Sequence, residues 1–420
     1  MLAGTRPRLP GAMVMSSSQR AQPARPLSAA PGPAPRDGSA LTRRRLLGTS
    51  AAALATGGTA ALGTAQPAAA AAPAPVRPAP PDDAESVLFL LGTAGGPPPV
   101  TTRTGTASAL SVRGRVHVVD CGRSAVTQYG RTGLRFRDLD SVFLTHLHAD
   151  HTADYANFLL LAAHGVNDVG DAIRTPFDAY GPGPAGALPP AHGSQPPATI
   201  DPADPTPGLK GLTDKSVEAN AYSCNIFLRE SGAPGPGGAA RVHEIELPDV
   251  GADPLRNRAP DMEPFLVMDD GTVRVTAVLV PHGLVFPCFA YRFDTPDGSV
   301  VFSGDTAPSD NVVRLARGAD VLVHEVIDLD FYRNSTGYGQ ALLDHFAAAH
   351  TDVTLIGPLA ERCGVATLVL THLVPADTFL VSDASWRRRA QRGFSGRVVV
   401  GNDLDRIPLR RHRAGGRPRP

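Results

Sequence analysis

Residues 145–151, THLHADH, bring four side chains that commonly bind metal ions into six consecutive positions. His146 and His148 are two residues apart, so both imidazoles can face one side of an extended turn. Asp150 and His151 follow where a helix is expected to begin, and they can face a second ion nearby. Imidazole and carboxylate together suit Zn²⁺ or a similar borderline metal. A lone histidine is more often a structural residue, but this spacing predicts a metal site.

Two metal ions need more ligands than this cluster supplies, and three later residues occupy comparable places. His282 follows the apolar run VRVTAVLVP, Asp305 follows VVFSG, and His372 lies in LVLTHL. Each is weak evidence alone, because histidine and aspartate also stand at strand ends for structural reasons. Together they share one placement, the end of a predicted strand, which is where α/β proteins form ligand sites. We therefore expect all three to join the first cluster in one centre.

Apolar periodicity predicts the elements that must position these residues. Strands are expected in SVLFLLG, ALSVRGRVHVVD, LDSVFLTH, GTVRVTAVLV, CFAYRF, SVVFSG, DVLVHEV, ATLVLTHL and GRVVVG, with helical spacing between several of them. A turn at Asp297-Gly298 joins two of these strands. Strand pairs come first in each half and strand–helix alternation follows. This order indicates an α/β fold with two sheets packed face to face and helices outside, an αββα sandwich.

The stretch from about 165 to 265 differs, because it is rich in proline and glycine. Pieces such as YGPGPAGALPPAHGSQPP predict long irregular loops, with a short strand or helix, inserted beside the main body. We expect one domain over residues 86–410 that carries this insert, followed by a basic, disordered tail over 411–420. The whole end segment RIPLRRHRAGGRPRP is expected to be solvated.

The order of the motifs resembles a known group. HxHxDH, a later histidine, GDT and THL follow one another as in the metallo-β-lactamase fold hydrolases. LGTAGG, VVDCG, FAYRF and VLVHE are also similar to the branch that contains ribonuclease Z and secreted arylsulfatase-like enzymes. The resemblance covers about residues 86–405 apart from the insert. It implies an αββα fold of the metallo-β-lactamase type, two Zn²⁺ ions with Mn²⁺ or Fe²⁺ as alternatives, and hydrolysis by a hydroxide that bridges them.

The resemblance assigns the metal ligands by motif. One ion would be held by His146, His148 and His282. The other would be held by Asp150, His151 and His372, and Asp305 would bridge the two.

Further roles follow from the same resemblance. The expected catalytic residues are Asp150, His350 and Glu325. His350 would assist the leaving group, and Glu325 would orient His350. The run after His350 is Thr-Asp rather than the family's Ser-Thr, so a helix-capping segment is the alternative. Asp120 in VVDCG would orient a ligand histidine, unless it only caps a turn. His324 is expected to be structural.

One difference from ribonuclease Z bears on the expected substrate. Ribonuclease Z enzymes carry a Gly/Pro-rich arm for tRNA, in several of them before the GDT strand, whereas the link here is only DTPDGS. We therefore expect a small-molecule ester, either a phosphodiester or an aryl sulfate, and we regard nucleic acid as the less favoured partner. The alternatives are a ribonuclease Z-like endoribonuclease and a lactonase or thioesterase of the same fold. A non-catalytic metal-binding module is the least favoured.

The N-terminal segment predicts export. Residues 42–47 read TRRRLL, an Ala/Gly/Leu-rich run follows, and small residues suited to a signal peptidase come next. This looks like a twin-arginine signal, which makes the twin-arginine translocase a partner and the location periplasmic or extracellular. Residues 1–75 are expected to comprise this signal and a disordered start. A membrane anchor is disfavoured, because glycine and threonine interrupt a weakly apolar run.

Composition limits the partners further. The 420 residues have a formal net charge of zero, and eight arginines but one aspartate lie before residue 75. The mature body would therefore be mildly acidic, without general attraction for nucleic acid. Four cysteines form no CxxC pair and are expected to be buried thiols. A homodimer is compatible with the branch, although no interface signature is visible.

Overall fold

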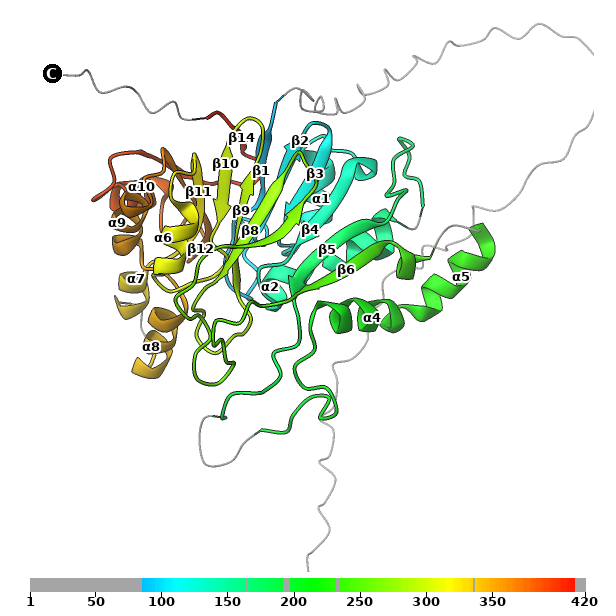
Figure 1. Cartoon of the computed structure of the whole chain (residues 1–420), viewed down its shortest axis with the longest axis horizontal. Coiled ribbons are helices and arrows are strands. Elements are labelled where there is room, and N and C mark those ends of the chain that lie inside the picture. The colour runs from blue at the N-terminus through cyan, green and yellow to red at the C-terminus, as the bar shows by residue number, and fades with distance from the viewer. Residues whose placement is uncertain (1–84, 164, 192–196, 232–234, 335–336, 412–420) are drawn as a thin grey trace, which may run out of the picture. The chain divides into compact units, whose positions relative to one another are not determined.

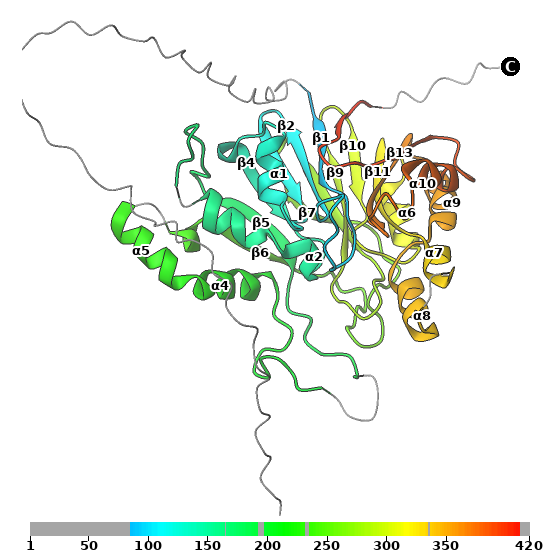
Figure 2. The ribbon, with the colours of Figure 1, turned by 180° about the vertical axis from the view of Figure 1, so that it is seen from behind.

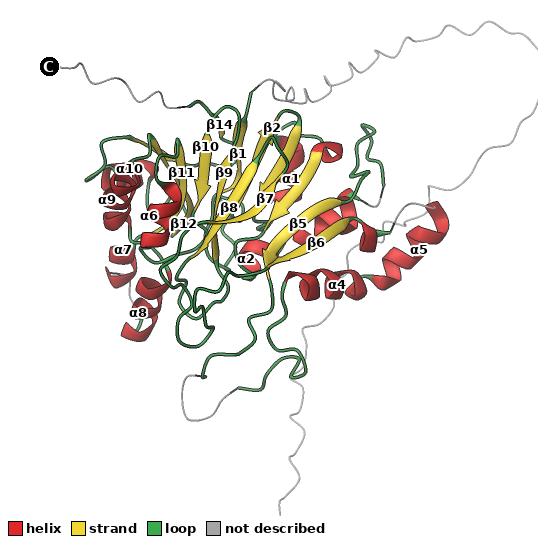
Figure 3. Cartoon of the chain, in the orientation of Figure 1, coloured by secondary structure: helices red, strands yellow, loops and turns green. Residues whose placement is uncertain are grey.

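The computed structural model describes residues 85–163, 165–191, 197–231, 235–334 and 337–411. Two seven-stranded sheets pack face to face, and helices lie on the outer side of each sheet (Figures 1 and 3). The predicted αββα sandwich is therefore confirmed. The predicted export signal and the tail beyond residue 411 lie outside the described residues and stay predictions.

The first sheet has the order β14-β1-β2-β3-β4-β5-β6. Its strands are β1 (Val87–Gly92), β2 (Ala107–Val112), β3 (Arg115–Val119), β4 (Leu139–Phe143), β5 (Phe177–Pro182), β6 (Ala240–Ile245) and β14 (Arg406–Pro408). The pairs from β14 to β3 are antiparallel, and those from β3 to β6 are parallel.

The second sheet has the order β13-β12-β11-β10-β9-β8-β7. Its strands are β7 (Phe265–Asp269), β8 (Arg274–Leu279), β9 (Phe289–Asp294), β10 (Ser299–Phe302), β11 (Val321–Ile327), β12 (Thr367–Val374) and β13 (Arg397–Val400). It repeats the arrangement of the first sheet, because the pairs from β7 to β10 are antiparallel and those from β10 to β13 are parallel.

Helices cover the outer faces of both sheets, as the view from behind also shows (Figure 2), except that α5 (Ala221–Ser231) projects away from the first sheet and is almost wholly exposed. They are α1 (Ala125–Arg131), α2 (Ala149–Thr152), α3 (Tyr155–Asn157), α4 (Leu209–Ala219), α5 (Ala221–Ser231), α6 (Asp310–Ala316), α7 (Leu329–Asn334), α8 (Gln340–Ala349), α9 (Val353–Cys363) and α10 (Asp383–Ala390). Side-chain caps begin three of them, since Ser309, Asp352 and Ser382 each accept a hydrogen bond from a first-turn backbone N–H.

Burial on both faces explains why β1 is apolar without interruption. In β1, Leu88 and Leu90 belong to the cluster between the sheets, whereas Phe89 and Leu91 pack on the other side under the helices. A strand covered on both faces has no polar side, so its sequence shows a run rather than an alternation. All four cysteines are buried and unpaired, as expected.

The region from 165 to 265 is more regular than its composition predicted. It supplies β5 and β6, which extend the first sheet, and the helices α4 and α5. In β5, Phe177 and Ala179 are buried while Asp178 and Tyr180 are less so, an alternation that the surrounding prolines and glycines hide. The irregular parts are the connections, chiefly residues 183–191, 197–208 and 246–264.

The link between β9 and β10 is short. Residues 295–298 form a tight turn between β9 and β10, with Thr295 N–H donating to the Gly298 carbonyl at 3.0 Å, so the predicted short link is confirmed.

The C-terminal segment is not solvated throughout, because β14 pairs with β1 and Leu409 is buried. Within the described residues, no helix is both long and apolar enough to cross a membrane.

Candidate metal centre

All seven predicted ligands meet at one end of the sandwich, where four separate segments converge. The loop from β4 into α2 carries residues 146–151, His282 follows β8, and Asp305 follows β10. His372 lies within β12, at a point where the pairing with β11 skips one residue. This bulge gives His372 a φ of 44° and leaves it outside the ladder, so its imidazole can turn toward the other ligands.

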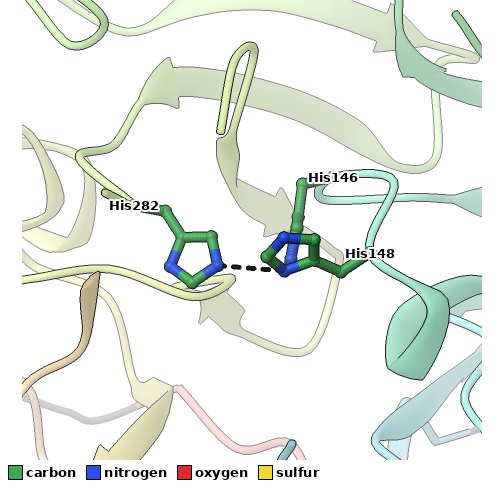
Figure 4. A group of neighbouring side chains, drawn as sticks. All are labelled: His146, His148 and His282. Atoms are coloured by element: carbon green, nitrogen blue, oxygen red, sulfur yellow. Dashed lines mark hydrogen bonds between the residues drawn. The ribbon is translucent and has the colours of Figure 1, made fainter. Parts of the chain in front are cut away.

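The first group consists of three histidines whose rings point toward one another (Figure 4). His282 Nε2 lies 3.2 Å from a ring nitrogen of His148, and the His146 ring centroid is 4.8 Å from that of His282. Nδ1 of His282 lies 2.8 Å from the Ala349 carbonyl oxygen, a contact that fits a donated N–H and directs Nε2 into the group. His148 is exposed, so this group borders solvent.

The second group has two carboxylates and two imidazoles, and Asp305 connects it to the first. His372 Nε2 lies 3.3 Å from Asp150 Oδ2 and 3.1 Å from Asp305 Oδ2. On the other side, Asp305 lies 3.3 Å from His151 Nε2 and 3.7 Å from His282 Nε2. Its carboxylate therefore stands between the two predicted ligand groups, as a bridging role requires.

The donor atoms at this centre fit metal ions. Buried atoms that lack a hydrogen-bond partner include His146 Nε2, His151 Nε2, Asp150 Oδ1 and Asp305 Oδ1. Buried polar atoms are normally satisfied, so such a concentration in one place indicates an absent partner. Among the described residues, no lysine or arginine forms an ion pair with either of these carboxylates. A cation at each group would satisfy the donors and the charge together.

The protonation preferences agree with this reading. Burial and the neighbouring His151 hold the pKa of His146 well below its usual range. Burial likewise lowers the pKa of His282 to about 4. Both imidazoles are therefore neutral and can offer a lone pair, which metal binding requires. Burial opposes charge on His151 as well, but Asp305 and Asp120 outweigh it and raise its pKa, so this position attracts positive charge.

Asp120 contacts the centre as predicted. Its Oδ2 lies 2.8 Å from His151 Nδ1, and its Oδ1 accepts a hydrogen bond of 2.8 Å from the Thr145 N–H. With Nδ1 facing a carboxylate, His151 presents Nε2 to the ligand group. Asp120 has a φ of 60°, a conformation that aspartate tolerates better than most residues. The alternative, a turn cap without contact to the centre, is therefore wrong.

His350 and Glu325 also lie at the rim of the centre. His350 Nδ1 is 3.4 Å from Glu325 Oε1 and 3.9 Å from Asp305 Oδ2. Glu325 is held in turn, because its Oε1 accepts hydrogen bonds from the Thr306 and Thr351 N–H groups. Burial disfavours charge on His350, but the facing Glu325 carboxylate raises its pKa to about 9.

His324 is buried away from the ligand groups. Its Nδ1 lies 2.7 Å from the Glu325 carbonyl oxygen, which fits its expected structural role.

Sequence reasoning missed the part played by two glycines. A β-carbon at Gly95 would lie 2.3 Å from His372 Nδ1, so only glycine lets the chain pass this close. The Gly96 N–H donates to Asp150 Oδ2 at 3.1 Å and fixes that carboxylate. The signal was present in LGTAGG, where two glycines follow a buried strand, but their contact lies far along the chain.

Comparisons with known proteins agree with this geometry. Residues 100–167 match the family model of the Metallo-beta-lactamase superfamily. Ribonuclease Z from Mycobacterium bovis is 32% identical over 325 residues, which cover 77% of this chain and 98% of that protein. Ribonuclease Z from Mycobacterium avium is 31% identical with the same coverage. Among solved structures, human tRNase Z, short form, is 21% identical with a TM-score of 0.50, covers 77% of this chain and 99% of its own, and supports the fold.

Proposed function

Because the chain belongs to the ribonuclease Z family of the metallo-β-lactamase superfamily, we propose that it is a metal-dependent phosphodiesterase of the ribonuclease Z type. The observation that carries the proposal is the meeting of both ligand groups at Asp305, among buried donor atoms without partners. The sequence favoured a small ester over nucleic acid. Relatives named ribonuclease Z, matched over nearly their whole length, support RNA as the substrate better.

The chain's own residues would divide the work as follows. His146, His148 and His282 would hold one ion, and Asp150, His151 and His372 the other, with Asp305 between them. When bound, such ions lower the pKa of a water molecule and stabilise negative charge on the phosphoryl oxygens. Zn²⁺ suits this mixture of imidazole and carboxylate, and Mn²⁺ or Fe²⁺ is the alternative.

His350 is the proposed proton donor. Its side chain is 14% exposed, so one edge of the ring can reach a substrate while Nδ1, on another edge, faces the Glu325 carboxylate at 3.4 Å. A raised pKa keeps this imidazole protonated at neutral pH, which is the state that can protonate a leaving oxygen. Glu325 is a positioning residue, because it contacts His350 and two backbone N–H groups.

One observation favours a second candidate, the hydrolysis of small phosphodiesters. The four-residue turn between β9 and β10 leaves no room for a tRNA-gripping arm at that place. Aryl sulfate cleavage, lactone or thioester hydrolysis, and simple metal binding remain predictions with no specific support beyond the fold.

A paired assay tests the proposal. The full chain, loaded with Zn²⁺ or Mn²⁺, is given a 3′-extended tRNA precursor, bis-p-nitrophenyl phosphate and p-nitrophenyl sulfate, each with and without chelator. Chelator-sensitive cleavage of the precursor supports the nuclease, and cleavage of the diester alone supports the second candidate. Cleavage of the sulfate alone, or of nothing, overturns both.

A matched pair of variants ties any activity to the centre. Asp150→Ala should abolish turnover, whereas Asp214→Ala on the exposed side of α4 should not, because Asp214 pairs with Lys210 at the surface. Equal turnover in the two variants would separate the activity from the metal centre.

A further inference from the structure

An apolar cavity of about 710 Å³ opens directly beside the metal centre. His148, one of the proposed ligands, and its neighbour Leu147 form part of its wall. Residues 183–189 and 205–207, which follow β5, form a second wall together with one side of α4, and residues 284–287 form a third. Figures 1 and 2 both place α4 at the end of the sheets where α2 carries ligands. A group in this cavity would therefore lie next to an ester held at the centre.

The lining of the cavity is mostly apolar. Leu188, Leu212, Leu284 and Phe286 line it together with several prolines. Among the described lining residues, the only lysine or arginine is Lys215.

Lys215 is not free to bind a phosphate. Its Nζ lies 2.6 Å from an Asp201 carboxylate oxygen and 3.4 Å from one of Asp204. A polyanionic chain needs unpaired cations along its path, and this wall provides none among its described residues. An uncharged apolar group, by contrast, gains free energy by leaving water here.

We propose that this cavity is a substrate subsite that binds an uncharged alkyl or aryl group attached to the scissile ester. The inference rests on the proposed diester hydrolysis for its position relative to the reaction. The volume of the cavity lies in the range of small-molecule sites, which are mostly apolar with a few polar groups. Leu188 and Leu284 are about half exposed, at 48% and 46%, so a bound apolar group could cover apolar surface at the mouth of the cavity. An ester bound at the metal centre would place one of its two organic groups beside His148, and the subsite would favour esters in which that group is apolar.

The main test is a series of alkyl p-nitrophenyl phosphates, from methyl to octyl, given to the metal-loaded full chain. The leaving group is constant, so only burial of the alkyl chain varies. A fully buried methylene is worth a factor of about four in affinity. We expect kcat/KM for the octyl ester to exceed that for the methyl ester at least ~100-fold, mainly through KM. A ratio within threefold would overturn the subsite.

The failure of catalysis is distinguishable from the failure of the subsite. If no ester is cleaved, the proposed function fails, but calorimetric binding of octyl phosphate against methyl phosphate still measures the cavity. Tighter binding of the octyl compound with a negative heat-capacity change supports the subsite. Equal binding of the two would overturn it.

Variants on α4 and the opposite wall locate the effect. Ala219→Trp would fill the cavity, and Leu284→Glu would place a charge at its mouth; both positions are exposed, so the fold should survive. Each should lower the octyl-to-methyl ratio at least tenfold. The control Glu218→Trp adds the same ring at a neighbouring exposed position that does not line the cavity, and it should leave the ratio unchanged. Unchanged ratios in both cavity variants would assign the chain-length effect elsewhere and refute the subsite.

Discussion

Replacing Asp120 by asparagine should weaken one metal site while leaving the fold in place. The asparagine oxygen can still accept a hydrogen bond from the Thr145 N–H, which lies 2.8 Å from Asp120 Oδ1 in the native chain. Its amide, however, would place a donor against His151 Nδ1, where a carboxylate oxygen lies 2.8 Å away in the native chain. Two donors then face each other, so His151 must change tautomer or rotate, and Nε2 is no longer presented to the ligand group.

The magnitude follows from these contacts. Loss of a partner that orients a ligand lowers metal affinity by about 10- to 100-fold, which corresponds to about 1.4–2.7 kcal/mol. Exchanging a charged for a neutral acceptor at Thr145 should cost about 1 kcal/mol of unfolding free energy. Titration of the metal-free protein with Zn²⁺ against a chromophoric chelator measures the first quantity, and thermal unfolding measures the second.

A matched control separates this effect from the loss of any aspartate. Asp178 on β5 also contacts a histidine, with its Oδ1 2.8 Å from His243 Nε2, but that pair lies on the surface away from the centre. Asp178→Asn should leave zinc affinity unchanged. If Asp120→Asn still binds two ions with affinities within threefold of the native values, the orienting role of this carboxylate is refuted.

Three further changes test other parts of the structure. Gly95→Ala should lower zinc stoichiometry and turnover, because the added methyl group would lie 2.3 Å from an imidazole nitrogen; Gly130→Ala, with open space around it, should instead be neutral or stabilise α1 by about 0.5–1 kcal/mol. Glu325→Gln should move the basic limb of the pH–kcat profile to lower pH, because that carboxylate raises the pKa of His350 and the donor must stay protonated; an unmoved limb would contradict this assignment. Phe293→Ala, at a fully buried site between the sheets, should lower the free energy of unfolding by about 3–5 kcal/mol in a denaturant titration, and a loss below about 1 kcal/mol would contradict the packing described.

The ligands could be predicted from the sequence because their chemistry is local. His146, His148, Asp150 and His151 occupy one loop, and few other functions explain four such residues at that spacing. His282 and Asp305 were recognisable because each follows a strand, and strand ends gather at one edge. His372 was placed at a strand end by its sequence, but it lies within β12 at a bulge that turns its side chain toward the others. The contact of Asp120 with a ligand histidine was implied by the family resemblance, and it forms because VVDCG ends β3, which pairs with β4.

Other features depend on contacts that no short stretch encodes. Gly95 is needed because of His372, which lies at the other end of the chain. The strand β14 has three residues and forms only against β1, so a basic composition hid it. The cavity beside His148 arises where α4, residues 183–189 and residues 284–287 meet, and their sequences share no motif.

Both sheets contribute ligands, and this ties metal supply to the integrity of the sandwich. Residues 146–151 extend from the first sheet, while His282, Asp305 and His372 belong to the second. An ion bound by ligands from both sheets would join the two layers at that end, much as a covalent cross-link would. Ions that bind only the folded chain add RT ln(1 + [M]/Kd) to its stability, about 2.7 kcal/mol at a free concentration 100 times Kd. The melting temperature should then report the free metal concentration around the protein, and metal depletion should loosen this end of the sandwich before the rest.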